Sequence, residues 1–220
     1  MTIPTAAAGF VGFYAALLAA HMWAAPPQLF DPQAAKYLGR WLYLTYQSNV
    51  ICCVYFGVAL FDATLGGGAW SAPLMRFFPL VFSLGGFLSL AYYSLDHFNP
   101  ENVRRKERCR SEYPYVHWCS HIEHGHAAPL VLLHAALLEC PQRVALPTSY
   151  DVHFFVSVFI LFYVVLVHAN HFCTGRWPYA IIDDVTRIGG TALRIFFFVV
   201  LACAFVALGL SGAELVRARC

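Results

Sequence analysis

Six long apolar stretches constrain this chain more than any other feature of its sequence. A helix that crosses a bilayer needs about 20 mostly apolar residues, because the hydrocarbon core is about 30 Å thick and each residue adds about 1.5 Å. Stretches of this length occur at 7–25, 41–61, 74–95, 118–138, 152–169 and 188–210. The sequence therefore predicts an all-α fold, an integral membrane bundle of six transmembrane helices.

Composition and charge agree with a membrane protein and exclude several function classes. Hydrophobic residues make up 60% of the chain and charged residues only 12%, against about 25% charged residues in soluble domains. A net charge of +2 gives no electrostatic reason to expect a nucleic-acid partner. The apolar composition makes membrane lipids the expected partners. Because no polar segment is long enough for a core of its own, 1–220 is predicted to form a single transmembrane helical domain.

The charged residues also bear on targeting and orientation. No Lys or Arg precedes Lys36, so 7–25 lacks the basic start of a cleaved signal peptide and is expected to be a retained span. We expect a multipass protein of the endoplasmic reticulum or the plasma membrane. Most Lys and Arg follow the first, third and fifth stretches, and the positive-inside rule places that side in the cytosol.

Polar residues inside the apolar stretches concentrate at one face of the predicted membrane bundle. An ionisable group at mid-helix costs about 2.5–3.5 kcal/mol on insertion scales, so the positions of such groups are informative. Alternating helix directions bring them to the side of the odd-numbered loops. The group comprises His21, Trp41, Tyr43, Thr45, Tyr46, Gln47, Asn49, Asp96, His97, His117, Ser120, His121, Glu123, His124, His126, His168, Asn170 and His171. We expect a polar site one or two helical turns inside the bundle.

Two kinds of chemistry fit these residue types, and a non-catalytic lipid-binding protein is a third interpretation. A neutral His could take the proton of Thr45 as its hydroxyl attacks an ester carbonyl. Alternatively, His117, His121 and His124 lie at i, i+4 and i+7 on one helix face and could ligate iron, as in membrane lipid oxidases and hydroxylases. The further ligands of such a site would be His168 and His171, with Asp96 and His97 nearby. Against the metal interpretation, no two His are adjacent, unlike the histidine boxes of those enzymes.

Three segments occur in the order of a known family's motifs. They are Gly-Arg-Trp-Leu-Tyr-Leu-Thr-Tyr at 39–46, Trp-x-x-His-x-x-His at 118–124 with Pro129 downstream, and Thr-Gly-Arg-Trp-Pro-Tyr at 174–179 with His171 before it. Together they resemble the androgen-induced and androgen-dependent tissue-factor-pathway-inhibitor-regulating protein family of multipass membrane threonine hydrolases. Members are described with both termini in the cytosol, opposite to the positive-inside assignment, so the side that the site faces stays open.

The resemblance implies an activity and assigns roles to individual residues. Family members hydrolyse fatty acid esters of hydroxy fatty acids with a Thr nucleophile and a His, here Thr45 and His124, and no cofactor or metal is implied. A shifted alignment would make His126 the base. The residues expected to orient the base, bind the oxyanion or contact substrate are His121, Ser120, Asn49, Tyr46 and His171, with Arg40 or Arg176 for a substrate carboxylate. Trp41, Trp118, Trp177 and Tyr179 are expected in an aromatic belt.

Overall fold

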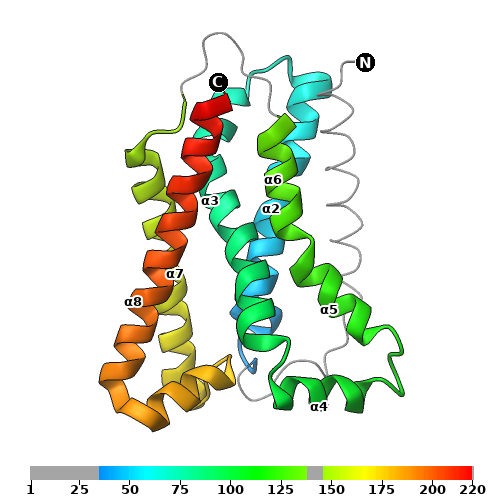
Figure 1. Ribbon diagram of the computed structural model, residues 1–220, viewed down its shortest axis with the longest axis vertical. Coiled ribbons are helices and arrows are strands. Elements are labelled where there is room, and N and C mark those ends of the chain that lie inside the picture. Colours follow the sequence, from blue (N-terminus) through cyan, green and yellow to red (C-terminus); the bar gives the residue numbers. More distant parts are fainter. Residues whose placement is uncertain (1–34, 138–145, 220) are drawn as a thin grey trace.

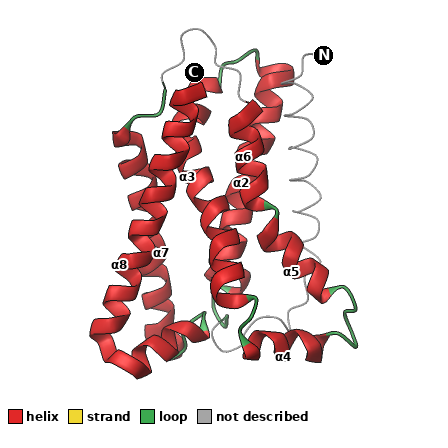
Figure 2. Ribbon diagram, viewed as in Figure 1, coloured by secondary structure: helices red, strands yellow, loops and turns green. Residues whose placement is uncertain are grey.

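The structure is a computed structural model that describes residues 35–137 and 146–219, in which every regular element is helical (Figure 1). Figure 2 shows no strand in these two ranges. The helices are α2 (Leu44–Phe61), α3 (Ser71–Ala91), α4 (Pro100–Cys109), α5 (Val116–Gly125), α6 (Ala127–Leu137), α7 (Ser149–Thr174) and α8 (Ala180–Arg219). Short helical turns η2 (Gly39–Leu42), η3 (Asp62–Gly66) and η4 (Tyr92–Asp96) precede α2 and extend α2 and α3. The predicted all-α class is therefore confirmed.

Four helical segments are long and apolar enough to cross a membrane, which indicates an integral membrane protein. They are Leu44–Leu65, Ser71–Asp96, Ser149–Thr174 and Ala180–Arg219, and they cover four of the six predicted spans. The first predicted span, 7–25, lies outside the described residues. A bundle of six transmembrane helices therefore remains a prediction.

The fourth predicted span is two helices in the structure, α5 and α6, separated at His126. The expectation of one continuous helix over 118–138 is wrong. Pro129 explains the break, because it has no backbone N–H to donate and its ring clashes with the carbonyl of Gly125, four residues earlier. α5 consequently leans outward from the bundle while α6 continues along it (Figure 1).

Helix α3 is the centre of the bundle and packs against α2, α6, α7 and α8. Its side chains Phe78, Val81 and Leu84 are fully buried. Small residues allow the neighbouring helices to approach closely, as is common in membrane bundles. A Cβ on Gly212 of α8, for example, would lie 2.7 Å from the Phe82 ring, so a larger side chain there would push α8 away from α3.

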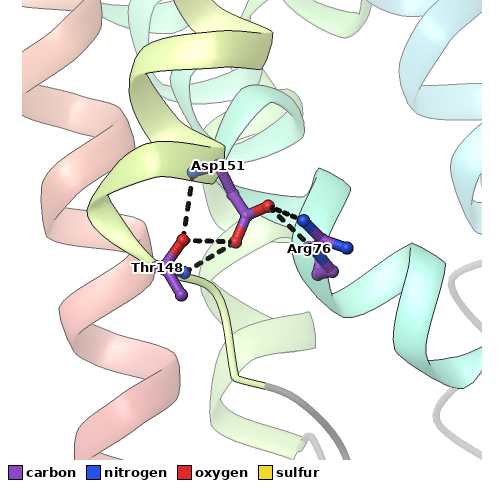
Figure 3. A network of polar contacts seen from close by, with 3 residues as sticks. All are labelled: Arg76, Thr148 and Asp151. Atoms are coloured by element: carbon purple, nitrogen blue, oxygen red, sulfur yellow. Dashed lines mark hydrogen bonds and ion pairs between the residues drawn. The ribbon is translucent and has the colours of Figure 1, made fainter.

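A polar network fixes the beginning of α7 to α3 (Figure 3). Thr148 and Asp151 form a capping box, in which the Asp151 N–H donates to the Thr148 hydroxyl and the Thr148 N–H donates to the Asp151 carboxylate. The Arg76 Nε on α3 donates to the same carboxylate at 2.8 Å. Since the side chain of Asp151 is only 2% exposed, the carboxylate of this ion pair is shielded from water.

The opposite end of the bundle gathers the segments that the sequence predicts to share one face. There, α4 lies across the bundle beside the beginnings of α2 and α5, and the first turns of α8 also run across it (Figure 1). α8 then changes direction at Gly189 and Gly190, and Gly190 has φ 63° and ψ −158°. Such a backbone is accessible essentially only to glycine. The predicted sixth span, 188–210, therefore begins at this kink.

Candidate active site

A cavity of about 610 Å³ opens at this end of the bundle, within the size range of small-molecule sites. Seven of the residues predicted for the site line it: Arg40, Thr45, Tyr46, Asn49, Ser120, His124 and Arg176. Its walls also include apolar side chains deeper in the bundle, among them Phe87, Leu88 and Leu201, and charged or amide side chains of α4. The cavity thus suits a ligand with a long apolar part and a polar part.

Thr45 and His124 are in direct contact, because the Thr45 Oγ1 lies 3.2 Å from the His124 Nε2. The Nδ1 of the same ring lies 2.7 Å from the carbonyl oxygen of Ser120. A carbonyl only accepts hydrogen bonds, so in the neutral ring the proton must be on Nδ1 and Nε2 presents its lone pair to the hydroxyl. The Thr45 hydroxyl therefore donates to His124, which is the geometry required for general-base activation of a hydroxyl.

The beginning of α2, where Thr45 lies, is held by two tyrosines from distant segments. The Leu44 N–H donates to the Tyr179 hydroxyl at 2.8 Å, which satisfies one of the free N–H groups of the first helical turn. The Tyr163 hydroxyl donates to the Leu42 carbonyl at 3.1 Å. The geometry of this turn is thus set by side chains from distant segments and not by a local N-cap, since Tyr43 makes no side-chain capping bond.

The aromatic-belt prediction is wrong for the buried Trp177 and stays a prediction for Trp41 and Trp118. Trp41 and Trp118 are exposed, at 53% and 70%, as side chains facing the membrane interface would be. Trp177 is only 5% exposed and stacks on His171 at 4.0 Å between ring centres. Because Trp177 and Tyr179 pack inward around the start of α2, the 174–179 motif supports the site instead of anchoring the protein in lipid.

Three further side chains support the His124 ring and the backbone beside it, and of these only Asn49 is among the predicted residues. The Asn49 amide, one turn after Thr45 on α2, donates to the Glu123 carbonyl at 3.0 Å. The Tyr92 ring stacks on the imidazole, with the ring centres 4.1 Å apart. Ser89, near the end of α3, places its hydroxyl in the α5–α6 break. This hydroxyl donates to the His124 carbonyl and accepts from the Ala128 N–H at 3.2 Å.

Ser89 and Tyr92 are the functional residues that sequence reasoning missed. In an unbroken helix the Ala128 N–H would bond the His124 carbonyl directly, and here the Ser89 hydroxyl is inserted between them. The helix-breaking residue Pro129 was a visible signal for a bend beside His124. No comparable signal identified Ser89 as the side chain that fills the bend, because Ser89 lies on another helix.

The structure does not bring His121 and His171 to the cavity. The His121 Nδ1 shares a hydrogen bond with the Tyr93 hydroxyl at 3.0 Å, and its ring also contacts His97. The expectation that His121 orients His124 is not supported, because the His121 ring lies against the end of α3 and the His124 Nδ1 bonds the Ser120 carbonyl. His171 stacks on Trp177 instead.

The histidines of the metal interpretation are likewise dispersed. His117 pairs with Glu107 at 3.0 Å, His124 with Thr45, and His171 with Trp177. Within residues 35–137 and 146–219, no group of three or more His, Cys, Asp or Glu side chains has the arrangement needed to hold a metal ion. The iron-ligating set suggested by the spacing of His117, His121 and His124 is therefore not assembled.

Comparison with known families agrees with the motif resemblance. The family model described as FAR-17a/AIG1-like protein matches residues 9–216, nearly the whole chain. The chain belongs to this family. It is the androgen-induced family that the three motifs resemble, so that prediction is confirmed. Membership is consistent with a membrane hydrolase. No curated protein and no solved structure matches the chain.

In this FAR-17a/AIG1-like chain, Ser89→Ala is expected to lower kcat roughly tenfold for the ester hydrolysis that the family resemblance implies, while the protein stays folded. Without the hydroxyl, the His124 carbonyl and the Ala128 N–H lose their shared partner, and the bend that aims the imidazole relaxes. Displacements of about 1 Å at a catalytic group cost up to about 100-fold in rate. The measurement is steady-state kinetics together with a thermal melting curve in detergent.

The matched control is Ser83→Ala. Ser83 is another buried serine of α3, and its hydroxyl also bonds backbone carbonyls, those of Pro79 and Phe205. It is not among the residues that line the cavity. We expect Ser83→Ala to lower the melting temperature without a matching decrease in kcat. Equal losses of kcat and stability in both variants would contradict a positioning role for Ser89.

Proposed function

We propose that this protein is a membrane-embedded lipid ester hydrolase in which Thr45 is the nucleophile and His124 the general base. The observation that carries the proposal is the 3.2 Å contact between the Thr45 hydroxyl and the unprotonated Nε2 of His124, at the wall of a cavity. The proposed substrates are fatty acid esters of hydroxy fatty acids, a class that comes from the family resemblance. The amphipathic lining of the cavity is consistent with such substrates.

In the proposed reaction, the Thr45 Oγ1 attacks the ester carbonyl carbon and its proton passes to the His124 Nε2. The tetrahedral intermediate collapses, the ester C–O bond breaks, and the leaving hydroxy fatty acid takes the proton from His124. Water then attacks the acyl-Thr45 ester with His124 again as base. This second half releases the fatty acid and restores the threonine.

The remaining predicted residues divide by position into supporting and substrate-facing groups. Ser120 acts through its carbonyl, which fixes the His124 tautomer, and Asn49 acts by holding the backbone beside His124. Tyr46 lines the cavity next to Thr45 and is our proposed donor to the developing oxyanion. Arg40 and Arg176 also line the cavity and are our proposed contacts for a substrate headgroup.

Covalent labelling tests the nucleophile directly. The detergent-solubilised protein is treated with a fluorophosphonate probe, and the adduct is located by mass spectrometry. We expect one adduct, on Thr45, that disappears in Thr45→Ala and is strongly reduced in His124→Ala. Two matched controls should label like wild type: Thr64→Ala, at the far end of the same helical segment, and His168→Ala.

His168 is a sharp control because its Nδ1 bonds the Val164 carbonyl four residues earlier at 2.8 Å, as the His124 Nδ1 does with Ser120. The two histidines differ in that the imidazole in contact with the Thr45 hydroxyl is that of His124. An adduct on another residue would contradict the assignment of Thr45. A wild-type protein that binds the lipid ester but is neither labelled nor active would instead indicate a non-catalytic lipid-binding protein.

A further inference from the structure

Lys106 on α4 is a buried cation that the proposed reaction does not use. Its side chain points into the bundle and the residue is only 8% exposed, unlike the exposed Arg104 and Arg108 on the same helix. The Nζ lies 2.9 Å from the Tyr92 hydroxyl and 4.8 Å from the centre of the Tyr92 ring. Lys106 also lines the cavity that contains Thr45 and His124.

The ammonium group of Lys106 has no direct counter-ion among the described residues. An ammonium has three hydrogens to donate, and the Tyr92 hydroxyl is the one hydrogen-bond acceptor that the described part of the chain supplies. The ion pairs within 4.0 Å in residues 35–137 and 146–219 do not include Lys106. Burial lowers the pKa of Lys106, and the more distant acids Asp96 and Glu123 offset only part of that decrease.

We propose that Lys106 binds the free carboxylate of the substrate, so that the enzyme selects lipid esters that carry a free acid. This inference rests on the proposed hydrolase function. Burial of a charge without a partner is unfavourable, and an arriving carboxylate supplies both the opposite charge and the missing acceptors. The chemical class selected is an anionic lipid ester, as opposed to a neutral ester of the same chain length.

The position of Lys106 relative to the base fits one substrate molecule reaching both. The Tyr92 ring lies between them, with its centre 4.1 Å from the centre of the His124 imidazole and 4.8 Å from the Lys106 Nζ. The ammonium is therefore at most about 9 Å from the imidazole centre. A substrate with its carboxylate at Lys106 can run along Tyr92 and present its ester to Thr45.

Burial distinguishes Lys106 from the two arginines that the sequence suggests for a carboxylate. Arg176 is exposed and Arg40 is partly exposed, so water and salt weaken the attraction of either for a carboxylate. Lys106 is shielded from solvent and its field is screened less. Lys106 is therefore the cation expected to decide between charged and neutral substrates.

The test compares two substrates that differ by one charge: the palmitate ester of hydroxystearic acid as the free acid, and the same compound as its methyl ester. Palmitate release gives kcat/KM for each, and the ratio of the two values is the readout. We expect wild type to favour the free acid. Lys106→Met should lower the ratio roughly 10- to 100-fold, the usual range for a hydrogen bond to a charged group, mainly through KM.

Matched variants separate charge recognition from structure. Lys106→Arg should keep part of the preference, because it keeps the positive charge. Arg104→Gln removes a positive charge from the exposed side of α4 and should leave the ratio unchanged. Equal losses on both substrates in Lys106→Met would overturn the proposal, since they would mean that Lys106 only supports Tyr92 and His124.

Two further results keep this proposal distinguishable from the proposed function. If Thr45→Ala still hydrolyses both substrates, the nucleophile assignment fails, while a change of ratio in Lys106→Met would still support carboxylate recognition. With wild type alone, free hydroxystearate should inhibit competitively and its methyl ester should not. Equal inhibition by both compounds would overturn the proposal without any variant that must fold.

Discussion

Thr45→Ala is expected to abolish ester hydrolysis, with kcat falling by about 1,000-fold or more, because the proposed acyl-enzyme forms on the Thr45 hydroxyl. The side chain occupies the first turn of α2 and is only partly buried, so removing its hydroxyl leaves the bundle intact. The measurement is fatty acid release from a hydroxy fatty acid ester in detergent micelles. Melting temperature and lipid binding, measured on the same preparation, should be close to wild type.

Thr45→Ser is the informative companion. Serine keeps the hydroxyl 3.2 Å from the His124 Nε2 and loses only the methyl group, so we expect activity within about tenfold of wild type. Loss of activity in both variants would point to the methyl group or to the fold, and not to nucleophilic attack. Full activity of Thr45→Ala would contradict the mechanism outright.

His124→Ala has the second-largest expected effect, a decrease in kcat of about 100- to 10,000-fold, the usual range for general acid and base catalysis. In the proposed mechanism its Nε2, which lies 3.2 Å from the Thr45 hydroxyl, takes the Thr45 proton, and its Nδ1 is fixed by the Ser120 carbonyl. Because truncation leaves a space at the wall of the cavity, added imidazole should restore part of the rate. The measurement is kcat with increasing imidazole.

His126→Ala tests the alternative base. The His126 Nδ1 bonds the Ile122 carbonyl, and the imidazole that meets Thr45 is that of His124. We therefore expect His126→Ala to retain most of the activity and to gain nothing from imidazole. The opposite result, with His126→Ala inactive and rescued while His124→Ala stays active, would transfer the role of base to His126.

Helix positions and the shared face of the site follow from the sequence because they depend on local patterns. Apolar runs place helices within a few residues of 41–61, 74–95 and 152–169, since burial in lipid imposes their length. Alternating directions then place Thr45 and His124 at the same end. The pairing of these two residues came from the family resemblance, and their catalytic roles stay predictions.

What the sequence could not predict depends on which helices face each other. A spacing of three and four residues shows that His117, His121 and His124 are near one another on α5, yet it does not show what lies opposite each of them. The end of α3 lies opposite His121, and α2 lies opposite His124. For the same reason Ser89, 35 residues before His124, and Tyr92 were missed.

The hydrogen bond from the Leu44 N–H to the Tyr179 hydroxyl couples two residues 135 positions apart, one beside the nucleophile and the other between the last two helices. A ribosome therefore synthesises Thr45 long before the residue that closes its helical turn. Since membrane segments enter the bilayer as they are made, the reactive hydroxyl acquires its final setting only when the closing segment has packed. On the proposed mechanism, hydrolytic competence is accordingly a late event in biogenesis, because a chain still lacking Tyr179 has no group to close the turn that carries Thr45.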